Sequence, residues 1–254
     1  MPVDEITRMR RMPDGKDLAE ELHRAMTRLE KFGVKYPPGY CDTITQRYTL
    51  KNVPYPYIVM QIGESRIRKH FLYSELFGKK ENLLDYGCGT GDAIRQLIRD
   101  GYPASRITGF DVSDASLRIG YDLYLDRDEI EPLVSVAASF SCPSERFDRV
   151  YSGSVIHVLR DEGDFTEYLR KAYRTLKPTG IFFGSTLGLA DAAAGRPEQG
   201  PPRLMRREGL LDAMEEAGFT DIRIVIEERP AFAQRGRGLC LYQFSAKKGM
   251  ERLS

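Results

Sequence analysis

The sequence predicts a fold of the α/β class, in which helices cover both faces of a mostly parallel sheet. Three observations lead to this prediction. The apolar pair Leu83 and Leu84 is typical of the end of a short buried strand. Glycines at 87, 89 and 91 then allow the backbone to turn sharply, and apolar residues at helical spacing over 93–99 indicate a helix. Strand-like and helix-like segments alternate after it, which favours a Rossmann-like, doubly wound sheet of seven strands.

The later elements are predicted by the same criteria. Strands are expected at 106–112, 133–138, 147–152, 181–186, 220–227 and 239–246, and helices at 114–126, 164–177 and 207–217. Ser113 is a suitable N-cap for the first of these helices, and Gly180 and Gly218 follow the ends of the other two. The stretch 187–205 is rich in glycine and proline, and long loops that follow a strand commonly serve a binding site.

Residues 1–80 precede this alternating core, which we assign to 81–248 as a single domain. Helices are expected at 16–32 and 58–77, and irregular proline–tyrosine stretches at 36–40 and 53–57, on either side of 41–52. The prolines argue against an ordinary helix or a central strand in either of these two proline–tyrosine stretches. We interpret 1–80 as a lid of helix and loop over the ligand site, followed by a lead-in helix.

The composition limits the class of protein. Among 254 residues, 38 are basic and 37 acidic, which gives a net charge of +1, and the basic runs are short. Such balance gives no support for nucleic-acid binding. The four cysteines lack metal or redox spacing, and no apolar run approaches a membrane span. We therefore expect a cytoplasmic protein with free thiols, a small-molecule substrate and no metal, nucleic-acid or membrane partner, while the oligomeric state stays open.

Two classes of ligand use a glycine turn of this kind. A dinucleotide site requires G-x-G-x-x-G, but the third glycine comes one residue early here, at Gly91, and Asp92 takes its place. The carboxylate of Asp92 would repel a pyrophosphate at the helix N-terminus, and a cationic cofactor tolerates it better. Asp111, at the end of the second predicted strand, suits hydrogen bonds from the ribose hydroxyls of an adenosine cofactor in either class.

The string 85–91 reads D-Y-G-C-G-T-G and resembles the first motif of the class I S-adenosylmethionine-dependent methyltransferases. The strings 147–159 and 169–180 match later motifs of the same class, in the same order. The resemblance implies S-adenosylmethionine as the cofactor and S-adenosylhomocysteine as its product. The cofactor-binding residues that we predict are Asp85, Gly87, Cys88, Gly89, Gly91, Asp111, Val112, Ser139, Phe140 and Ser152.

One part of the class pattern is missing. The third strand of these enzymes usually ends in an acid that contacts the adenine amino group, but this chain has Ser139 and Phe140 there. We expect Ser139 to offer a polar contact and Phe140 to cover the adenine face. Ser152, at the end of the fourth strand, is expected to hold the methionine end of the cofactor through its backbone. No N-P-P-Y-like string follows that strand, which disfavours N-methylation of bases or amides.

A looser resemblance concerns the methyl acceptor. The strings 53–57 and 119–128 resemble parts of the fungal meroterpenoid-pathway O-methyltransferases, which are thought to esterify carboxylates on terpenoid scaffolds. The resemblance implies an apolar small molecule typical of secondary metabolism, methylated on oxygen, with a carboxylate favoured over a hydroxyl. His157 lies where the class often carries a histidine near the substrate. A packing role for His157 and a role as catalytic general base both stay open.

Further substrate contacts are predicted in the lid and in the loop after the fifth strand. Aromatic side chains suit an apolar substrate and the charge of a sulfonium. An arginine could pair with a substrate carboxylate, although solvent exposure is the simpler interpretation for Arg196 and Arg203. The predicted substrate-binding residues are Tyr40, Tyr55, Tyr57 and Arg203.

Three alternative functions stay open. A nicotinamide-dependent dehydrogenase is disfavoured by Asp92 and by the missing third glycine. A protein or RNA methyltransferase would share this core, but it needs a basic or peptide-binding surface that the balanced charge does not indicate. A non-methylating catalyst would bind the cofactor only for its charge.

Overall fold

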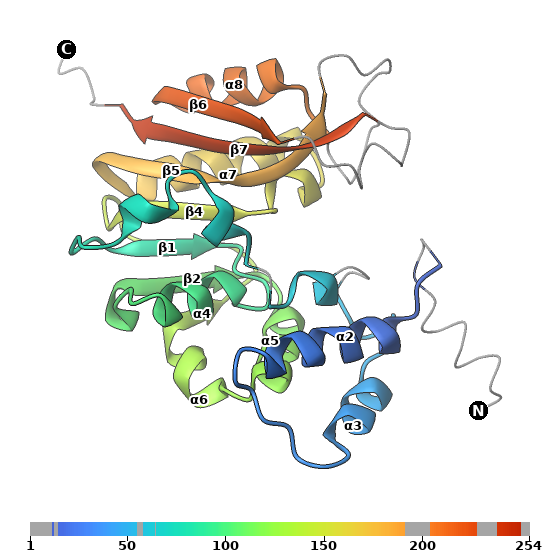
Figure 1. The fold of residues 1–254 in the computed structure, drawn as a ribbon. Coiled ribbons are helices and arrows are strands. Elements are labelled where there is room, and N and C mark those ends of the chain that lie inside the picture. The colour runs from blue at the N-terminus through green and yellow to red at the C-terminus, as the bar shows by residue number, and fades with distance from the viewer. Residues whose placement is uncertain are drawn as a thin grey trace.

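The computed structural model describes residue 12 and residues 15–54, 58–63, 65–190, 204–227 and 238–249. Within them, seven strands form one sheet in the order β3-β2-β1-β4-β5-β7-β6 (Figure 1). The strands are β1 Leu83–Tyr86, β2 Ile107–Asp111, β3 Val134–Val136, β4 Phe147–Gly153, β5 Leu176–Leu189, β6 Phe219–Glu227 and β7 Leu239–Lys248. The first five run parallel, whereas β7 pairs antiparallel with both β5 and β6. The predicted fold class is thus confirmed.

The central strand β1 is buried on both faces, as a parallel strand between helical layers must be. Leu83 and Leu84 are both fully buried, but their side chains enter different apolar clusters because successive residues of a strand point to opposite faces. The chain continues from β1 to β2 on one side and later returns to β4 on the other. This reversal next to β1 creates the switch point at which open sheets of this kind bind ligands.

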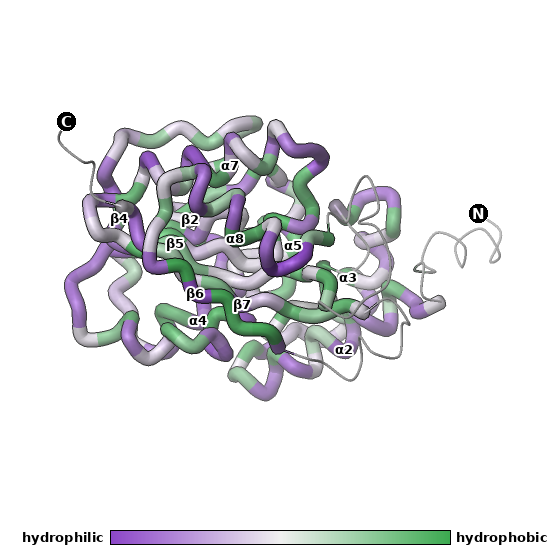
Figure 2. Tube along the Cα trace, turned by 90° about the horizontal axis from the view of Figure 1, so that it is seen from above, coloured by the Kyte–Doolittle hydropathy of each residue, from purple (hydrophilic) through white to green (hydrophobic). Residues whose placement is uncertain are grey.

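Helices cover the two faces of the sheet. The helices α4 Asp92–Arg99 and α5 Asp114–Tyr124 pack on one face, and α7 Glu162–Thr175 and α8 Arg207–Glu216 pack on the other. A short helix, α6, spans Arg127–Ile130, and the 3₁₀ helices η4 Ala104–Arg106, η5 Glu131–Leu133 and η6 Ile156–Val158 lie in the connections. In Figure 2 hydrophobic residues follow the strands in the middle of the molecule, and hydrophilic residues are frequent in the peripheral turns.

The N-terminal part forms a small layer of its own on α5. It contains α2 Leu18–Glu30, α3 Tyr40–Arg47 and η1 Ile58–Gln61, and its apolar side chains pack with Ile119 and Leu123 of α5. In Figure 1 this layer lies beyond the carboxyl ends of β1 and β2. Asp122 fastens it, because its carboxylate accepts hydrogen bonds from Tyr48 Oη at 2.6 Å and Arg47 Nη1 at 2.7 Å.

One prediction for this part is wrong. The single helix expected over 58–77 is replaced by η1, η2 Arg66–Lys69 and η3 Tyr73–Leu76, and Gly63 between them adopts a left-handed φ of +79° that an α-helix does not allow. The described residues 36–39 and 53–54 of the two proline–tyrosine stretches belong to no helix or strand, as expected, and α3 lies between them. Proline restricts only its own position and the one before it, so α3 fits between the two stretches.

Other boundaries shift by a few residues. The third strand, expected over 133–138, is limited to Val134–Val136 at the sheet edge. The helix expected over 164–177 ends at Thr175, because the chain enters β5 at Leu176, well before the predicted start at 181. Leu83 and Leu84 begin β1 rather than end it.

Candidate functional site

The glycine turn lies at the carboxyl end of β1, between the carboxyl ends of β2 and β4. The amides of Gly87 and Cys88 both donate to the carbonyl of Phe110, at 2.8 and 2.9 Å. Gly87 has a φ of +87°, and a Cβ there would overlap Val155, which follows β4. Glycine is therefore required at this position both by conformation and by packing.

Asp85, directly below the turn, is almost completely buried, at 1% exposure. Its Oδ2 atom has no hydrogen-bond partner. Burial, reinforced by the neighbouring carboxyl groups of Asp111 and Asp92, raises the pKa of Asp85 to about 8. A buried carboxyl oxygen that accepts no hydrogen bond destabilises the folded protein. A bound cation with N–H donors would neutralise the charge of the carboxylate and donate the missing hydrogen bond.

Asp111 ends β2 and faces the turn. Its Oδ2 accepts the Gly89 amide at 2.7 Å, and its Oδ1 accepts the Ser113 amide at 2.8 Å. Burial raises its pKa. A carboxylate has about four acceptor positions, so these two bonds leave capacity for the two hydroxyls of a ribose. The cap of α5 is supplied by Ser113 Oγ, as predicted.

The turn thus presents carboxyl groups from Asp85, Asp111 and Asp92 within one small region. Such an arrangement repels a pyrophosphate and attracts a ligand that carries positive charge. Gly89 has open space where its Cβ would lie, so a ligand can approach the backbone there. Cys88 points the other way: it is buried, its thiol pKa is raised by that burial, and its Sγ faces Gly109 of β2. Cys88 would therefore contact a ligand through its backbone only.

Three of the five exposed large apolar side chains in the described part of the chain lie at the carboxyl edge of the sheet. They are Val112 after β2, Val136 at the end of β3 and Val158 in η6, with exposures of 65%, 44% and 51%. Exposed apolar groups gathered at one edge are typical of a binding site. The predicted cofactor residue Val112 is accessible to an adenine or to an apolar acceptor.

Ser139 and Phe140 follow β3 and differ in exposure. Phe140 packs against Tyr86 and Phe110, with ring centroids 4.9 and 4.8 Å apart, so most of its surface belongs to the core. Ser139 is exposed, and its Oγ accepts a hydrogen bond from Lys171 Nζ at 2.7 Å. Contact of either residue with the adenine stays a prediction.

Ser152 is fully buried in β4. Its Oγ lies 2.8 Å from the hydroxyl of Tyr168, which is also 2.9 Å from the Tyr86 carbonyl. The side chain is therefore occupied by the core, and the predicted contact of the Ser152 backbone with the cofactor stays a prediction. The neighbouring strand also restricts this position, because a Cβ at Gly184 would overlap the Ser152 carbonyl.

His157 lies in η6, next to the start of the segment where β5 extends past the end of β4. The Leu187 amide lies 3.4 Å from His157 Nδ1, and Thr186 Oγ1 lies 3.2 Å from the same atom. Both residues belong to the part of β5 that extends beyond its pairing with β4. An amide can only donate, so Nδ1 accepts and the neutral ring carries its proton on Nε2. Burial, together with the nearby Arg66 guanidinium, lowers the pKa of His157 to about 4. His157 is thus a neutral side chain at physiological pH.

The predicted substrate residues are only partly described. Tyr55, Tyr57 and Arg203, like Arg196, lie outside the described residues. The Tyr40 hydroxyl donates to the Asp122 carbonyl at 2.8 Å and its ring stacks on Tyr36, so its contacts fasten α3 to α5. A substrate contact by Tyr40 stays a prediction.

Sequence reasoning missed three residues next to the site. Arg66 donates a hydrogen bond to Ser154 Oγ, directly after β4. Gly63 and Tyr124 both contact Asp92 at the end of the turn. Gly63 follows the mostly apolar stretch 58–62, and a glycine in that position is a stop signal that argues against one long helix.

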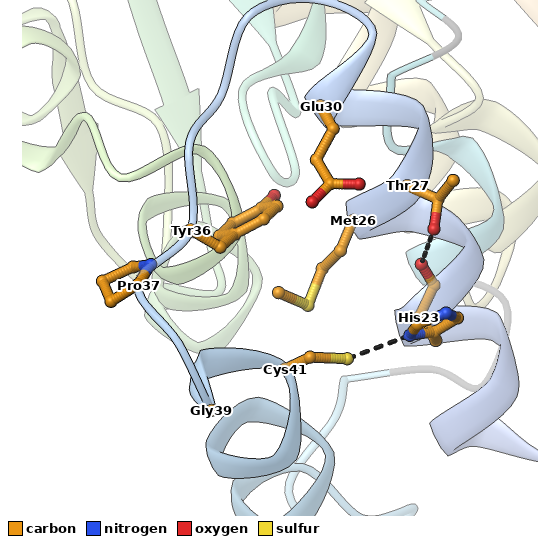
Figure 3. A pocket seen from close by; sticks show the side chains of 8 residues that line it. All are labelled: His23, Met26, Thr27, Glu30, Tyr36, Pro37, Gly39 and Cys41. Atoms are coloured by element: carbon orange, nitrogen blue, oxygen red, sulfur yellow. Dashed lines mark hydrogen bonds between the residues drawn. The ribbon is translucent and has the colours of Figure 1, made fainter.

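A separate cavity of about 180 Å³ opens between α2 and α3. Figure 3 shows it lined by residues of both helices and of the connection between them, among them Met26, Cys41 and Tyr36, with His23 Nδ1 3.0 Å from Cys41 Sγ. It belongs to the N-terminal layer rather than to the glycine turn. In the described part of the chain, no three His, Cys, Asp or Glu side chains are grouped to hold a metal. The helices described there are also too short or too polar to cross a membrane.

The comparison with protein families agrees with the turn. Residues 83–180 match the family model of the methyltransferase domain. Methyltransferase trt5 of Aspergillus terreus is 32% identical over 114 residues, which cover 42% of this chain and 40% of that protein. Methyltransferase ausD of Penicillium brasilianum is 32% identical over 120 residues, covering 44% and 42%. The matched stretch therefore spans about two fifths of these fungal relatives.

Solved structures share the fold. The [4+2]-cyclase SpnF superposes with a TM-score of 0.57 at 20% identity and covers 74% of this chain and 83% of its own. A phosphoethanolamine N-methyltransferase of Haemonchus contortus, solved with S-adenosylhomocysteine, has a TM-score of 0.55 at 19% identity, covering 74% and 54%. At such identities the likeness establishes the fold, and the different reactions in the two names show that the fold alone does not fix the chemistry.

Proposed function

We propose that this chain, whose residues 83–180 are a class I methyltransferase domain, transfers a methyl group from S-adenosylmethionine to an oxygen of an apolar small molecule. The observation that carries the proposal is the buried Asp85 carboxyl, with its Oδ2 unpartnered, beneath a turn that Asp111 also faces. A sulfonium cofactor with an adenosine group fits both the charge and the hydrogen-bonding capacity of this site. The proposed methyltransferase activity of the whole chain is inferred from this fit.

S-adenosylmethionine is the cofactor, S-adenosylhomocysteine is the product, and the sulfonium makes the transferred methyl group electrophilic. The chain has three tasks around it. Asp111 accepts the ribose hydroxyls, Asp85 counters positive charge, and the open space at Gly89 lets the ligand lie close to the turn. The rest of catalysis is alignment of the acceptor and exclusion of water.

The state of His157 favours a carboxylate acceptor over a hydroxyl. A carboxylate is already ionised near neutral pH, since carboxyl groups titrate at about 4. It needs no general base, whereas a base is most effective when its pKa lies near the working pH. With a pKa lowered to about 4 and Nδ1 directed at Leu187, His157 suits a role in packing and orienting the acceptor. The exposed Val112 and Val158 suit an apolar scaffold beside it.

In this proposal the N-terminal segment, up to about residue 60, completes the site as a lid. The layer of α2 and α3 is attached to α5, beyond the carboxyl ends of β1 and β2 (Figure 1). Closure over an apolar acceptor would exclude water from the reaction. The location of the protein in the cytoplasm and the absence of a nucleic-acid partner stay predictions.

A second candidate is a non-methylating catalyst that uses the cofactor for its charge. One structure that shares the fold is named as a cyclase, and because the fold alone does not fix the chemistry, this alternative stays open. Protein or RNA methylation also stays possible on this core, but no observation on the described surface favours it. Release of S-adenosylhomocysteine in the presence of an acceptor separates the methyltransferases from the non-methylating catalyst.

The proposal is tested with matched acceptors. Isoprenoid carboxylic acids and the alcohols of the same carbon skeletons are incubated with the protein and S-adenosylmethionine, and S-adenosylhomocysteine is quantified. We expect turnover of acids and little of alcohols. His157→Ala should lower single-turnover rates by less than about tenfold, below the range of about 10²–10⁴ for a positioned base, and the exposed His23→Ala serves as the matched control. Turnover of alcohols that rises through a pKa near about 6.5 and is lost in His157→Ala would make His157 a general base and the acceptor a hydroxyl.

A further inference from the structure

Asp92, which follows the glycine turn, is bound to a part of the chain far away in sequence. Its Oδ1 accepts the amide of Gly63 at 2.9 Å and also the hydroxyl of Tyr124, while its Oδ2 accepts the hydroxyl of Thr90. Its place after the glycine turn indicates an acid that tolerates a cationic cofactor. The contacts show that its carboxylate also joins the turn to the N-terminal segment and to the end of α5.

The surroundings hold Tyr124 firmly in position on the turn side. Arg95 lies over the Tyr124 ring, with its Cζ 4.1 Å from the ring centroid, and forms a bidentate pair with Asp126 at 2.6 and 2.7 Å. The same guanidinium binds the Thr90 carbonyl of the turn. Burial and the neighbouring Asp92 raise the pKa of Tyr124, so it stays protonated and donates to that carboxylate. The turn, Arg95 and Tyr124 therefore form one connected unit.

The N-terminal side is connected just as directly. Arg28 of α2 donates from Nε to the Ile62 carbonyl at 3.0 Å and from Nη2 to the Val59 carbonyl at 3.3 Å. The next amide along the chain, that of Gly63, donates to Asp92, and it also lies 3.1 Å from the Tyr124 hydroxyl. Hydrogen bonds thus run without interruption from α2, through 59–63, to the cofactor turn.

We infer that Asp92 is a positioning residue which couples the glycine turn to the N-terminal layer, so that cofactor binding and closure of that layer favour each other. The inference rests on the proposed cofactor site. A ligand that orders the turn at 87–92 also orders the Asp92 carboxylate, which accepts the hydrogen bond from the Gly63 amide. Because coupling between two sites is reciprocal, closure of the layer must strengthen cofactor binding by the same factor. The reaction site for an acceptor is then completed more readily when the cofactor is bound.

The Gly63 amide is itself the reporter. Amide hydrogen exchange of the full chain is measured with and without S-adenosylhomocysteine, alongside calorimetric affinity for that ligand. In the wild type we expect the ligand to slow exchange at Gly63 by at least about fivefold, the lower end of typical coupling factors. Tyr124→Phe and Asp92→Ala should reduce this ligand-dependent factor towards one and weaken binding by a similar factor. Asp92→Asn keeps an acceptor oxygen and should retain most of both effects.

The matched control is Tyr102→Phe, which removes a tyrosine hydroxyl bonded to the Glu81 carbonyl, away from the turn. It should leave the ligand-dependent exchange at Gly63 unchanged, whatever it does to stability. Ligand binding without slower exchange at Gly63 in the wild type overturns the inference and leaves the proposed function standing. So does full coupling in both Tyr124→Phe and Asp92→Ala. Failure of the wild type to bind the ligand at all overturns the proposed function together with the inference.

Discussion

Replacement of Asp85 by asparagine should remove a pH dependence from cofactor binding. The free protein holds a proton on Asp85 up to a pKa of about 8, because the carboxyl is buried beside Asp111 and Asp92. Bound positive charge favours the ionised carboxylate, which lowers this pKa in the complex. The complex then carries fewer protons than the free protein, so affinity must rise with pH between the two pKa values.

The size of the effect follows from the pKa of about 8. At about pH 6, ionising the carboxyl costs about 2.7 kcal/mol, since each pKa unit corresponds to about 1.36 kcal/mol. Affinity for S-adenosylmethionine should therefore be up to about 100-fold weaker at about pH 6 than on the plateau above about pH 8. About one proton should be released for each cofactor bound at the lower pH.

The assay is calorimetric titration of S-adenosylmethionine at several pH values and in buffers of different ionisation enthalpy. The α-amino group of the ligand titrates near about 7.7–8.0, so the decisive interval lies between about pH 5.5 and about pH 7, where that group stays charged. There the wild-type affinity should rise by up to about tenfold per pH unit, while Asp85→Asn should show no slope. An equal slope in the two proteins would refute the role given to Asp85.

Further predictions concern stability and are measured by urea unfolding unless stated. Gly120→Ala should destabilise the protein by about 1–3 kcal/mol, because the added Cβ would overlap the Thr90 carbonyl. Gly209→Ala, in a helix with open space around the added Cβ, should stabilise it by about 0.5–1 kcal/mol. Equal effects of the two substitutions would contradict the packing of α5 on the turn. Ile44→Ala, fully buried in α3, should cost about 2–5 kcal/mol if the N-terminal layer unfolds with the core, and a separate early transition would show that it does not. Because burial raises the pKa of Asp85, the contribution of this carboxyl to folding stability falls as the pH rises from about 4 to about 8. In thermal unfolding, the stability of Asp85→Asn relative to the wild type should therefore increase over that interval.

The sequence predicts the core because local patterns there agree with the packing. Leu83 and Leu84 are both buried because both faces of β1 are covered, and Asp111 ends β2, as expected. The glycines of the turn are likewise explained, Gly87 by its overlap with Val155. Each of these signals is short-range, and the parallel sheet fixes what lies beside it.

The N-terminal part is less predictable because its structure depends on distant partners. The helical spacing over 58–77 arises in fact from three 3₁₀ turns whose apolar side chains pack on the sheet or in the N-terminal layer. Nothing local to Tyr48 or Asp122 indicates that they meet across 74 positions. Likewise, the contact of Asp92 with Gly63 is a tertiary contact, which no motif encodes.

The most direct test of the central claim, that the glycine turn binds an S-adenosyl cofactor, is calorimetric titration of S-adenosylhomocysteine into the wild type and Asp111→Ala, with NAD titrated in parallel. Hydrogen bonds to a charged group contribute about 1.5–3 kcal/mol, so the folded variant should bind about tenfold or more weakly. We predict saturable binding of S-adenosylhomocysteine to the wild type and none of NAD. Preferential binding of NAD, or an unchanged affinity for S-adenosylhomocysteine in folded Asp111→Ala, would contradict the account.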